Sequence, residues 1–275
     1  MYKRQDTGPV HGPFIPELKE KEIKIRRIKD YLSDGKSVIA IGLHFPDACL
    51  DNAKTTPAET VGPYAYAQYE TVFLLRDIGL NVVKFLEKCG YKATLTESIT
   101  SFYSTVKNSR GYIPDMRTGN FEAFLSGAGY IGDNGVLITE KFGQRQRFIF
   151  IITDAEFSDD PLYEGKNYCE NCSHPCLKSC PTKAIKNSKI EIEVEGKKFS
   201  FPEIDYFACD WAKRYCLNGE EGPSYYGVDT DIPVPENKRK EKLIENLRKV
   251  KWGVQKLHLN ICEECIRSCP FKGKR

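Results

Sequence analysis

Cysteine is the residue type in this chain with the greatest capacity for chemistry. There are 11 cysteines, and nine of them lie in the last 107 residues. Cys169 to Pro181 reads C-x2-C-x3-C-x3-C-P, and Cys262 to Pro270 reads C-x2-C-x3-C-P. Neighbouring thiolates on one loop can bind several corners of an iron–sulfur cubane, and a cysteine followed by proline can turn away to a second cluster. The two runs therefore predict two iron–sulfur clusters that exchange ligands.

Zinc is the alternative occupant of such runs, but it favours separated C-x2-C pairs with four ligands in total. Here the first run already holds four cysteines that end in Cys-Pro, and the second run repeats that ending. This favours iron and sulfide, although the middle gap is one residue longer than in the bacterial ferredoxin run. The odd number of cysteines, without a secretory signal in Met1 to Pro16, disfavours a disulfide framework.

Two [4Fe–4S] clusters require eight thiolates. The two runs supply seven of them, at Cys169, Cys172, Cys176, Cys180, Cys262, Cys265 and Cys269. The eighth has to be a more isolated cysteine, Cys209 or Cys216. Cys49 and Cys89 lie in the other half of the chain, where we expect them to be small core residues.

The composition is that of a folded domain. A chain of 275 residues with 40% hydrophobic and 29% charged residues can bury a core, as one large domain or two small ones. No apolar run approaches the length of a transmembrane helix, and the N-terminus lacks the apolar segment of a signal peptide. We therefore expect a soluble, cytoplasmic protein with no membrane partner.

Hydrophobic periodicity locates the elements that must position the cysteines. The first half predicts a helix over 17–33, a long helix from Pro63 to about Cys89 that Gly90 ends, and strands over 38–45, 92–98, 136–139 and 148–154. Beyond residue 160 we expect a hairpin over 189–201 with Glu-Gly at its turn, and a basic helix over 241–257. Together they predict an α/β (α+β) fold with domains at 1–160 and 161–275.

The stretch from Gly127 to Gly132 fits the dinucleotide pattern G-x-G-x-x-G. That fingerprint has to follow a strand and begin a helix, whereas here a strand is predicted to follow it. A tight turn, or a close approach of the backbone to a bulky cofactor, is therefore favoured.

Positive charge gathers towards the end of the chain. Residues 236–275 carry a net charge of +7, against +3 for the whole chain. Compensation of negatively charged clusters is one explanation. An acidic electron donor, an anionic cofactor or an RNA backbone is the other, although no RNA-binding motif is visible.

Four segments of the chain resemble the epoxyqueuosine reductase and reductive dehalogenase superfamily. Ser37 to Phe45 is similar to the first core strand of the family, and Tyr64 to Val72 to the tyrosine-rich start of its long helix. Gly127 to Gly143 is similar to its G-x-G-W-I-G-K-N segment. The fourth segment is the cysteine order: the first run, then Asp205-x3-Cys209, then the C-terminal run.

The resemblance implies a nitroreductase-like N-terminal domain, a C-terminal two-cluster ferredoxin-like domain, and a cobalamin bound between them. It also implies the eighth ligand, because the lone cysteine of the family follows an aspartate by four positions, as Cys209 follows Asp205. One cluster would then bind Cys169, Cys172, Cys176 and Cys269, and the other Cys180, Cys209, Cys262 and Cys265. The residues expected at the cofactor are Gly127, Gly129, Tyr130, Ile131 and Gly132.

The proton donor is expected upstream of the glycine segment. Epoxyqueuosine reductases carry D-x-x-P-x-x-E-R there, and this chain has Asp115 about two positions out of register. Dehalogenases of the superfamily use a tyrosine beside a basic residue. The candidates are therefore Asp115, Tyr112 and Tyr103, with Glu70 as a further one.

Three functions are consistent with these features. The first is a cobalamin-dependent iron–sulfur reductase that acts on an epoxide, a halide or another activated bond. The second is an electron-transfer protein without its own corrinoid, which reduces a partner protein or its cofactor. The third is a flavin-dependent reductase. The expected partners are a small electron donor such as ferredoxin or flavodoxin and a small-molecule substrate, with tRNA as a further candidate.

Overall fold

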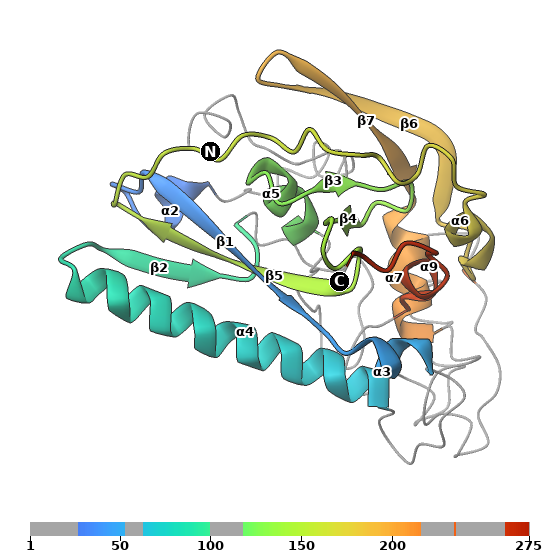
Figure 1. The fold of residues 1–275 in the computed structure, drawn as a ribbon, viewed down its shortest axis with the longest axis horizontal. Coiled ribbons are helices and arrows are strands. Elements are labelled where there is room, and N and C mark those ends of the chain that lie inside the picture. The colour runs from blue at the N-terminus through green and yellow to red at the C-terminus, as the bar shows by residue number, and fades with distance from the viewer. Residues whose placement is uncertain (1–26, 53–62, 100–117, 216–233, 235–261, 275) are drawn as a thin grey trace, which may run out of the picture.

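The computed structural model describes residues 27–52, 63–99, 118–215, 234 and 262–274. Within these ranges the fold is α+β, with helices packed on small antiparallel sheets. Figure 1 shows that the short helices nearest the cysteines gather beyond one end of the central sheet. These helices are α6 (Pro175–Ser179), α7 (Tyr206–Tyr215) and α9 (Glu264–Arg267).

The central sheet has the strand order β1-β5-β2 and is antiparallel throughout. Its strands are β1 (Ser37–His44), β2 (Ala93–Thr96) and β5 (Gln146–Thr153). β5 lies in the middle, and its side chains from Phe148 to Thr153 are all buried. A strand covered on both faces reads as a continuous apolar run, which is the pattern that predicted it. The three strands predicted over 38–45, 92–98 and 148–154 are confirmed, with ends that differ by a few residues.

Helix α4 (Pro63–Lys88) covers one face of this sheet. It begins at the predicted proline, and it ends where Gly90 takes a φ of 90° and the Tyr91 amide donates to the Leu86 carbonyl over 3.0 Å. A Cβ atom added to Gly79 would overlap Ile149 Cδ1, so this glycine allows the helix to lie close against β5. The helix therefore has a fixed depth on the sheet.

Helix α5 (Thr118–Leu125) packs on β5, and its aromatic side chains reach the second half of the chain. The Phe124 ring lies edge-on to Phe199 and Phe201, with centroids 4.9 and 5.4 Å apart. Both partners belong to β7 (Lys197–Ile204), so one hydrophobic cluster spans the boundary expected near residue 160. The division into two domains stays a prediction, and the two parts share core side chains.

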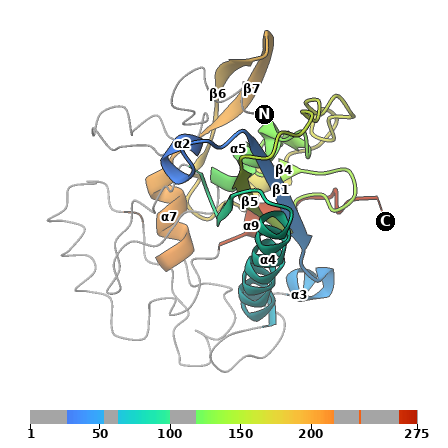
Figure 2. The same cartoon turned by 90° about the vertical axis from the view of Figure 1, so that its left-hand side faces the viewer.

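Two hairpins complete the described fold. β6 (Ile185–Val194) pairs with β7, and the turn at Glu195 and Gly196 has φ angles of 53° and 74°. Two successive residues with positive φ form the turn that suits a two-residue hairpin, so the predicted Glu-Gly turn is confirmed. β3 (Tyr130–Ile131) and β4 (Leu137–Ile138) form the other hairpin inside the glycine-rich segment. Figure 2 shows β6–β7 above the central sheet and α4 below it.

Some predicted elements lie outside the described residues. These are the basic helix over 241–257 and most of the helix over 17–33, of which α2 (Ile28–Tyr31) is the described part. α2 stops because Leu32 is extended, so the predicted end at Ser33 is wrong by two residues. A short helix not predicted from the sequence, α3 (Asp47–Asp51), follows β1. Within the described ranges no helix is long and apolar enough to cross a membrane.

Candidate metal centre

Both cysteine runs place a short helix directly before a Cys-Pro pair. α6 precedes Cys180, α9 precedes Ser268 and Cys269, and the two helices pack against each other. The hydroxyl oxygens of Ser179 and Ser268 lie 2.8 Å apart, and Ser179 Oγ also donates to the Glu264 carbonyl over 3.2 Å. The two runs are therefore joined at the point where each turns towards its last cysteine.

The loop of the first run is shaped by one left-handed residue. The Cys172 amide donates to the Cys169 carbonyl over 3.1 Å and closes a turn. His174 then takes a φ of 50°, which reverses the chain before Pro175. Proline suits the first helical position because its φ is already helical and its missing amide proton is not needed there. Cys176 is thereby held on the first turn of α6.

Cys180 and Cys209 are joined through Ala184. The Ala184 amide donates to Cys180 Sγ over 3.2 Å, and the Ala184 carbonyl accepts from the Asp205 amide over 2.8 Å. Asp205 caps α7, because its Oδ1 accepts from the Ala208 amide over 3.0 Å. Cys209, the residue after Ala208, lies on the first turn of α7. The D-x3-C motif is therefore a helix cap followed by a thiol.

Cys265 is partly buried, and its neighbouring thiols define one group. Burial raises the pKa of Cys265 well above its usual value. The nearby thiols of Cys209, Cys262 and Cys180 raise it further, because charges of the same sign disfavour one another. Four thiols from three separate segments therefore interact around one point.

Cys176 defines the second group. Burial raises the pKa of Cys176 to about 12, and the thiols of Cys269, Cys169 and Cys172 add to the shift. Here too one member, Cys269, comes from the other run. The two groups have the same members as the two ligand sets that the family resemblance implies, and ligation of clusters by these thiols stays a prediction.

These donor sets fit iron–sulfur clusters. Eight partly or fully buried thiols are costly to ionise unless a metal binds them, and thiolates are the ligands of [4Fe–4S] clusters. Backbone amides of Asp133, Leu177 and Ala184 point at Cys169, Cys176 and Cys180, as donors to ligand sulfurs do. Among the described residues, no group of three or more His, Cys, Asp and Glu side chains has the arrangement that would hold a single metal ion.

The remaining cysteines have different surroundings. Cys49 is half-buried and packs in an apolar cluster with Phe45 and Leu50, as expected for a small core residue. Cys89 is exposed just after α4, so its assignment to the core was wrong. It follows the last buried residue of the helix, where the periodic apolar face has already ended. Cys216 lies outside the described residues.

The glycines predicted at a cofactor are accounted for by contacts within the protein. A Cβ on Gly127 would overlap the Pro161 carbonyl oxygen, and a Cβ on Gly129 would overlap the Ile138 carbonyl oxygen. At Gly132 it would lie 2.7 Å from Ile138 Cδ1. The sequence favoured a tight turn or a close approach of the backbone to a bulky cofactor, and at these three glycines the approaching group is the chain itself.

A cavity of about 760 Å³ lies between the start of β1, residues 126–128 and residues 157–165. Of the five residues predicted at the cofactor, Gly127 borders this cavity, and Gly129, Tyr130, Ile131 and Gly132 do not. Ile131 is buried in the core that α5 covers. A cofactor role for these residues stays a prediction.

Polar groups of the glycine segment reach both cysteine runs. The Tyr130 hydroxyl accepts a hydrogen bond from the amide of Tyr168, the residue directly before Cys169, over 2.6 Å. The side-chain amides of Asn134 and Gln144 hydrogen bond to each other, and Asn134 also donates to the Cys265 carbonyl over 3.4 Å. The segment thus hydrogen bonds to the backbone at or directly before both cysteine runs.

A partly buried ion pair lies beside the group around Cys265. The Arg147 guanidinium at the start of β5 contacts the Glu263 carboxylate. The negative charge of the Cys265 thiolate favours the charged form of Arg147. Burial lowers the pKa of Arg147 to about 10 and raises the pKa of Glu263 to about 8. Direct contact of the two charges opposes both shifts, because each favours the ionised form of the other. The pair ties the central sheet to the second run.

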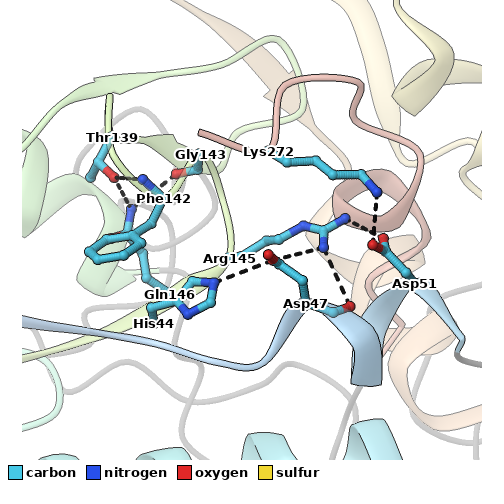
Figure 3. A network of polar contacts seen from close by, with 9 residues as sticks. All are labelled: His44, Asp47, Asp51, Thr139, Phe142, Gly143, Arg145, Gln146 and Lys272. Carbon is cyan, nitrogen blue, oxygen red and sulfur yellow. Dashed lines mark hydrogen bonds and ion pairs between the residues drawn. The ribbon is translucent and has the colours of Figure 1, made fainter. Parts of the chain in front are cut away.

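A second network anchors the end of the chain, as Figure 3 shows. Arg145, whose side chain is 2% exposed, donates to Asp47 over 2.8 Å and to Asp51 over 2.6 Å. The same Asp51 accepts from Lys272 over 2.8 Å. Lys272 follows Cys269 by three residues, so α3 and the start of β5 hold the segment that carries this cysteine.

The loop before β5 packs against the same tail. Gln146 donates to Thr139 Oγ1 over 2.8 Å and to the Gly143 carbonyl over 3.0 Å, which fixes the loop (Figure 3). A Cβ on Gly143 would lie 2.6 Å from the Phe271 carbonyl oxygen. The position of Cys269 is therefore set by contacts on both sides of the tail.

The predicted proton donors Asp115, Tyr112 and Tyr103 lie outside the described residues. Glu70 is exposed on α4. Gln68, one helical turn after Tyr64, is 3% exposed and donates to the Tyr64 hydroxyl over 2.7 Å and to Glu263 over 3.2 Å. Gln68 and Thr71 are therefore both buried polar residues of this helix face.

Several residues of the site were not predicted from the sequence. Ser179 and Ser268 carry a signal, since each stands directly before a Cys-Pro pair in a repeated Ser-Cys-Pro. Arg147 and Glu263 carry none, because their pairing joins positions 116 residues apart. A charge at the start of a strand is usually a solvent-facing residue.

No protein-family profile matches the chain. Over 117 residues it is 32% identical to tetrachloroethene reductive dehalogenase of Desulfitobacterium hafniense, a match that covers 42% of this chain and 18% of that protein. Over 143 residues it is 27% identical to epoxyqueuosine reductase of Atelocyanobacterium thalassa, which covers 46% of each protein. The solved structure of epoxyqueuosine reductase from Streptococcus thermophilus gives a TM-score of 0.45 at 19% identity, over 78% of this chain and 56% of that chain. The chain thus spans less than half the length of the two curated relatives.

Proposed function

The chain is a relative of the epoxyqueuosine reductases and reductive dehalogenases, and we propose that it is an iron–sulfur oxidoreductase that passes single electrons through two [4Fe–4S] clusters. In this proposal one cluster binds the thiols around Cys176, and the other binds the thiols around Cys265. The first set is Cys169, Cys172, Cys176 and Cys269, and the second is Cys180, Cys209, Cys262 and Cys265. Residues 161–275 form the ferredoxin-like part, and residues 1–160 form a nitroreductase-like part.

The observation that carries this proposal is the grouping of the thiols. Cys265 has Cys180, Cys209 and Cys262 as its charged neighbours. Cys176 has Cys269, Cys169 and Cys172 as its charged neighbours. Each group takes thiols from both runs, as crossed ligation in two-cluster ferredoxins requires. The Ser179–Ser268 contact and the tail anchor at Lys272 support the crossing.

The described residues contribute position and charge. Amide donors at Cys169, Cys176 and Cys180 favour thiolate over thiol, because a hydrogen bond to the charged form stabilises it. The buried guanidinium groups of Arg145 and Arg147 lie near Cys269 and Cys265 and offset negative charge there. Such hydrogen bonds, burial and charge are what set cluster potentials.

On the basis of the relatives, we propose a cobalamin as the group that receives the electrons from the clusters and reduces the substrate. When bound, it supplies a strongly reducing cobalt centre, and the protein supplies its position and a proton. Gly127 borders a cavity, and Gly129 and Gly132 contact the chain itself, so we derive no step through this group. Gln68 and Tyr64 are buried polar residues beside Glu263 of the second run.

The second candidate is an electron-transfer protein that has no corrinoid of its own and reduces a partner. The packing of the glycine segment on its own backbone favours this alternative. In both cases we propose a small donor such as ferredoxin or flavodoxin. The substrate is proposed only as a class, an epoxide carried on tRNA or a halide, since the chain spans 46% of one relative and 18% of the other.

The experiment is an anaerobic purification followed by a visible spectrum and mass spectrometry of released small molecules, with and without added cobalamin. Broad cluster absorption together with a retained corrinoid supports the reductase. Cluster absorption without a corrinoid, even after addition, supports the electron-transfer alternative. A flavin would support the nitroreductase-like alternative, and the absence of cluster absorption would contradict the proposed function.

A further inference from the structure

A pair of stacked rings joins the two cysteine runs at the surface. Tyr168 stands directly before Cys169, and Phe271 stands two residues after Cys269. The two ring centroids lie 3.6 Å apart, and the ring planes are inclined by 13°. Cys169 and Cys269 belong to the same proposed ligand set, so the ring pair links the two segments that would hold that cluster.

Lysine side chains surround this ring pair. The Nζ atoms of Lys166 and Lys274 lie over the Tyr168 ring, 5.4 and 5.7 Å from its centroid. The tail after α9 packs on the loop before β5, where the Lys274 amide donates to the Glu140 carbonyl over 2.9 Å. Four exposed lysines on the loop, on the tail and before Tyr168 form what we call the lysine patch: Lys141, Lys166, Lys272 and Lys274.

Carboxylates offset the charge of the patch only in part. The two lysines of the tail pair with Asp51 and with Glu140. Glu164, two residues before Lys166, pairs with a lysine of β7. Among the residues that the structure describes, neither Lys141 nor Lys166 forms an ion pair. The excess positive charge of the patch therefore belongs to these two exposed side chains.

We propose that the lysine patch is the docking surface of the electron donor, and that this donor is a small acidic redox protein. The inference rests on the proposed function, since the electron needs a cluster to receive it. A donor has to come close to its acceptor, and the patch surrounds the ring pair between the Cys169 and Cys269 segments. Positive charge steers an acidic partner to this place and orients it there. Electron-transfer interfaces are small, so a few exposed side chains are sufficient.

The positive charge of the patch would also attract a nucleic acid, but the rings favour a protein. Proteins that bind single-stranded nucleic acids stack the bases on aromatic side chains. Here Phe271 covers one face of the Tyr168 ring, and two ammonium groups lie over that ring. The Tyr168 ring is thus engaged within the protein, whereas an acidic protein requires only the exposed lysines.

The test is the binding of oxidised flavodoxin and of oxidised ferredoxin, two acidic proteins, to the anaerobically purified full chain by calorimetry. The patch variant combines Lys141→Glu with Lys166→Glu. We expect its affinity for the donor that binds to fall roughly tenfold at low salt, because rim charges govern association. The difference should close at about 0.5 M salt, where exposed charges are screened.

The matched control combines Lys84→Glu with Lys88→Glu. It makes the same change of charge on exposed residues in the last turns of α4, which end beside β2 and away from the tail (Figure 1). Its affinity for the donor should equal that of the unsubstituted protein. If the patch variant fails to fold, Lys141→Gln with Lys166→Gln removes the two charges without adding new ones and should weaken binding in the same direction.

A second measurement follows the electron itself. One electron leaves reduced flavodoxin or ferredoxin and enters an oxidised cluster, and no bond forms or breaks. Loss of cluster absorption after rapid mixing reports this transfer. In the patch variant its rate should fall roughly tenfold at low salt, in step with the affinity. The final amplitude should be unchanged, because the clusters themselves are intact.

Iron analysis of the same samples separates the possible failures. An unsubstituted chain without iron overturns the proposed function and this inference together. A chain with iron for two clusters that binds neither donor at low salt overturns the inference alone. Equal affinities in the patch variant and the unsubstituted protein, or equal losses in the patch and control variants, would also overturn it. So would a tRNA stem loop whose binding is lost in the patch variant while donor binding stays unchanged.

Discussion

The hydroxyl oxygens of Ser179 and Ser268 lie 2.8 Å apart, although the two residues are 89 positions apart in the chain. Each serine stands directly before the cysteine and proline that end its run. The contact therefore joins the two runs directly before their last cysteines. In the proposed ligand sets, Cys180 and Cys269 are the two thiols that cross to the cluster of the other run.

The Ser179–Ser268 bond should stabilise the two clusters together. We expect Ser179→Ala and Ser268→Ala each to cost about 1 kcal/mol, and so to speed iron loss to a chelator roughly fivefold. Because the bond between them is lost only once, the double variant should cost less than the sum of the two single variants. Ser158→Ala, at an exposed serine, is the control. Strict additivity of the two single changes would show that the hydroxyls do not act as a pair.

The identity of the eighth ligand can be tested by two parallel substitutions. Cys209 lies on the capped first turn of α7 beside Cys265, so Cys209→Ala should remove one cluster. Iron should fall by roughly half, because each [4Fe–4S] cluster carries four irons. Cys216→Ala and the exposed Cys89→Ala should keep the full iron content. Loss of iron in Cys216→Ala with retention in Cys209→Ala would mean that the ligand set is wrong.

The glycine segment should be required for folding even without any cofactor. A Cβ on Gly129 would overlap the Ile138 carbonyl, and backbone cannot move aside as a flexible side chain can. We expect Gly129→Ala to lower the free energy of unfolding by about 3 kcal/mol, as an overpacked site does. Gly90→Ala meets no atom within 4 Å and costs only its positive φ, about 1 to 2 kcal/mol. Urea unfolding without added corrinoid measures the free energy of unfolding of both variants. An unchanged free energy of unfolding in Gly129→Ala would contradict a packing role for this glycine and would favour a cofactor role for the segment.

The anchor of the C-terminal segment should weaken in acid. Hydrogen bonds from Arg145 and then Lys272 hold the pKa of Asp51 below its usual value, against the opposing effect of burial. A carboxyl group with a lowered folded pKa contributes stability above its unfolded pKa, and that contribution is lost as the pH falls through the folded value. The difference in Tm between the unsubstituted protein and Asp51→Asn should therefore be largest near neutral pH and should close below about pH 4.

The control for that pH dependence is Asp77→Asn, which removes an exposed carboxylate on α4. Comparison of differences between variants cancels the general acid sensitivity of the protein. A Tm difference for Asp51→Asn that stays constant with pH would show that Asp51 is not part of the anchor.

Much of the fold could be predicted from the sequence, because local signals coincide with packing. Pro63 and Gly90 mark the two ends of α4, and the continuous apolar run of β5 marks a strand covered on both faces. α3 could not be predicted, because five residues carry too little periodicity. Its place depends on a buried ion pair between Asp47 and Arg145, which are 98 positions apart.

Neighbouring thiols could be predicted more readily than the contacts that support them. Close spacing of the cysteines is a local signal, and closely spaced thiols are neighbours in the structure, while their role as cluster ligands stays a prediction. The supporting contacts are long-range, such as Asn134 to the Cys265 carbonyl, and no spacing rule predicts them. The glycine pattern was ambiguous for the same reason, since a close backbone approach does not identify the group that approaches.

Determination of metal and acid-labile sulfide in anaerobically purified protein tests the central claim most directly. The account predicts about eight irons and about eight sulfides per chain, as two [4Fe–4S] clusters require. Zinc in place of iron, with no sulfide, would contradict the account.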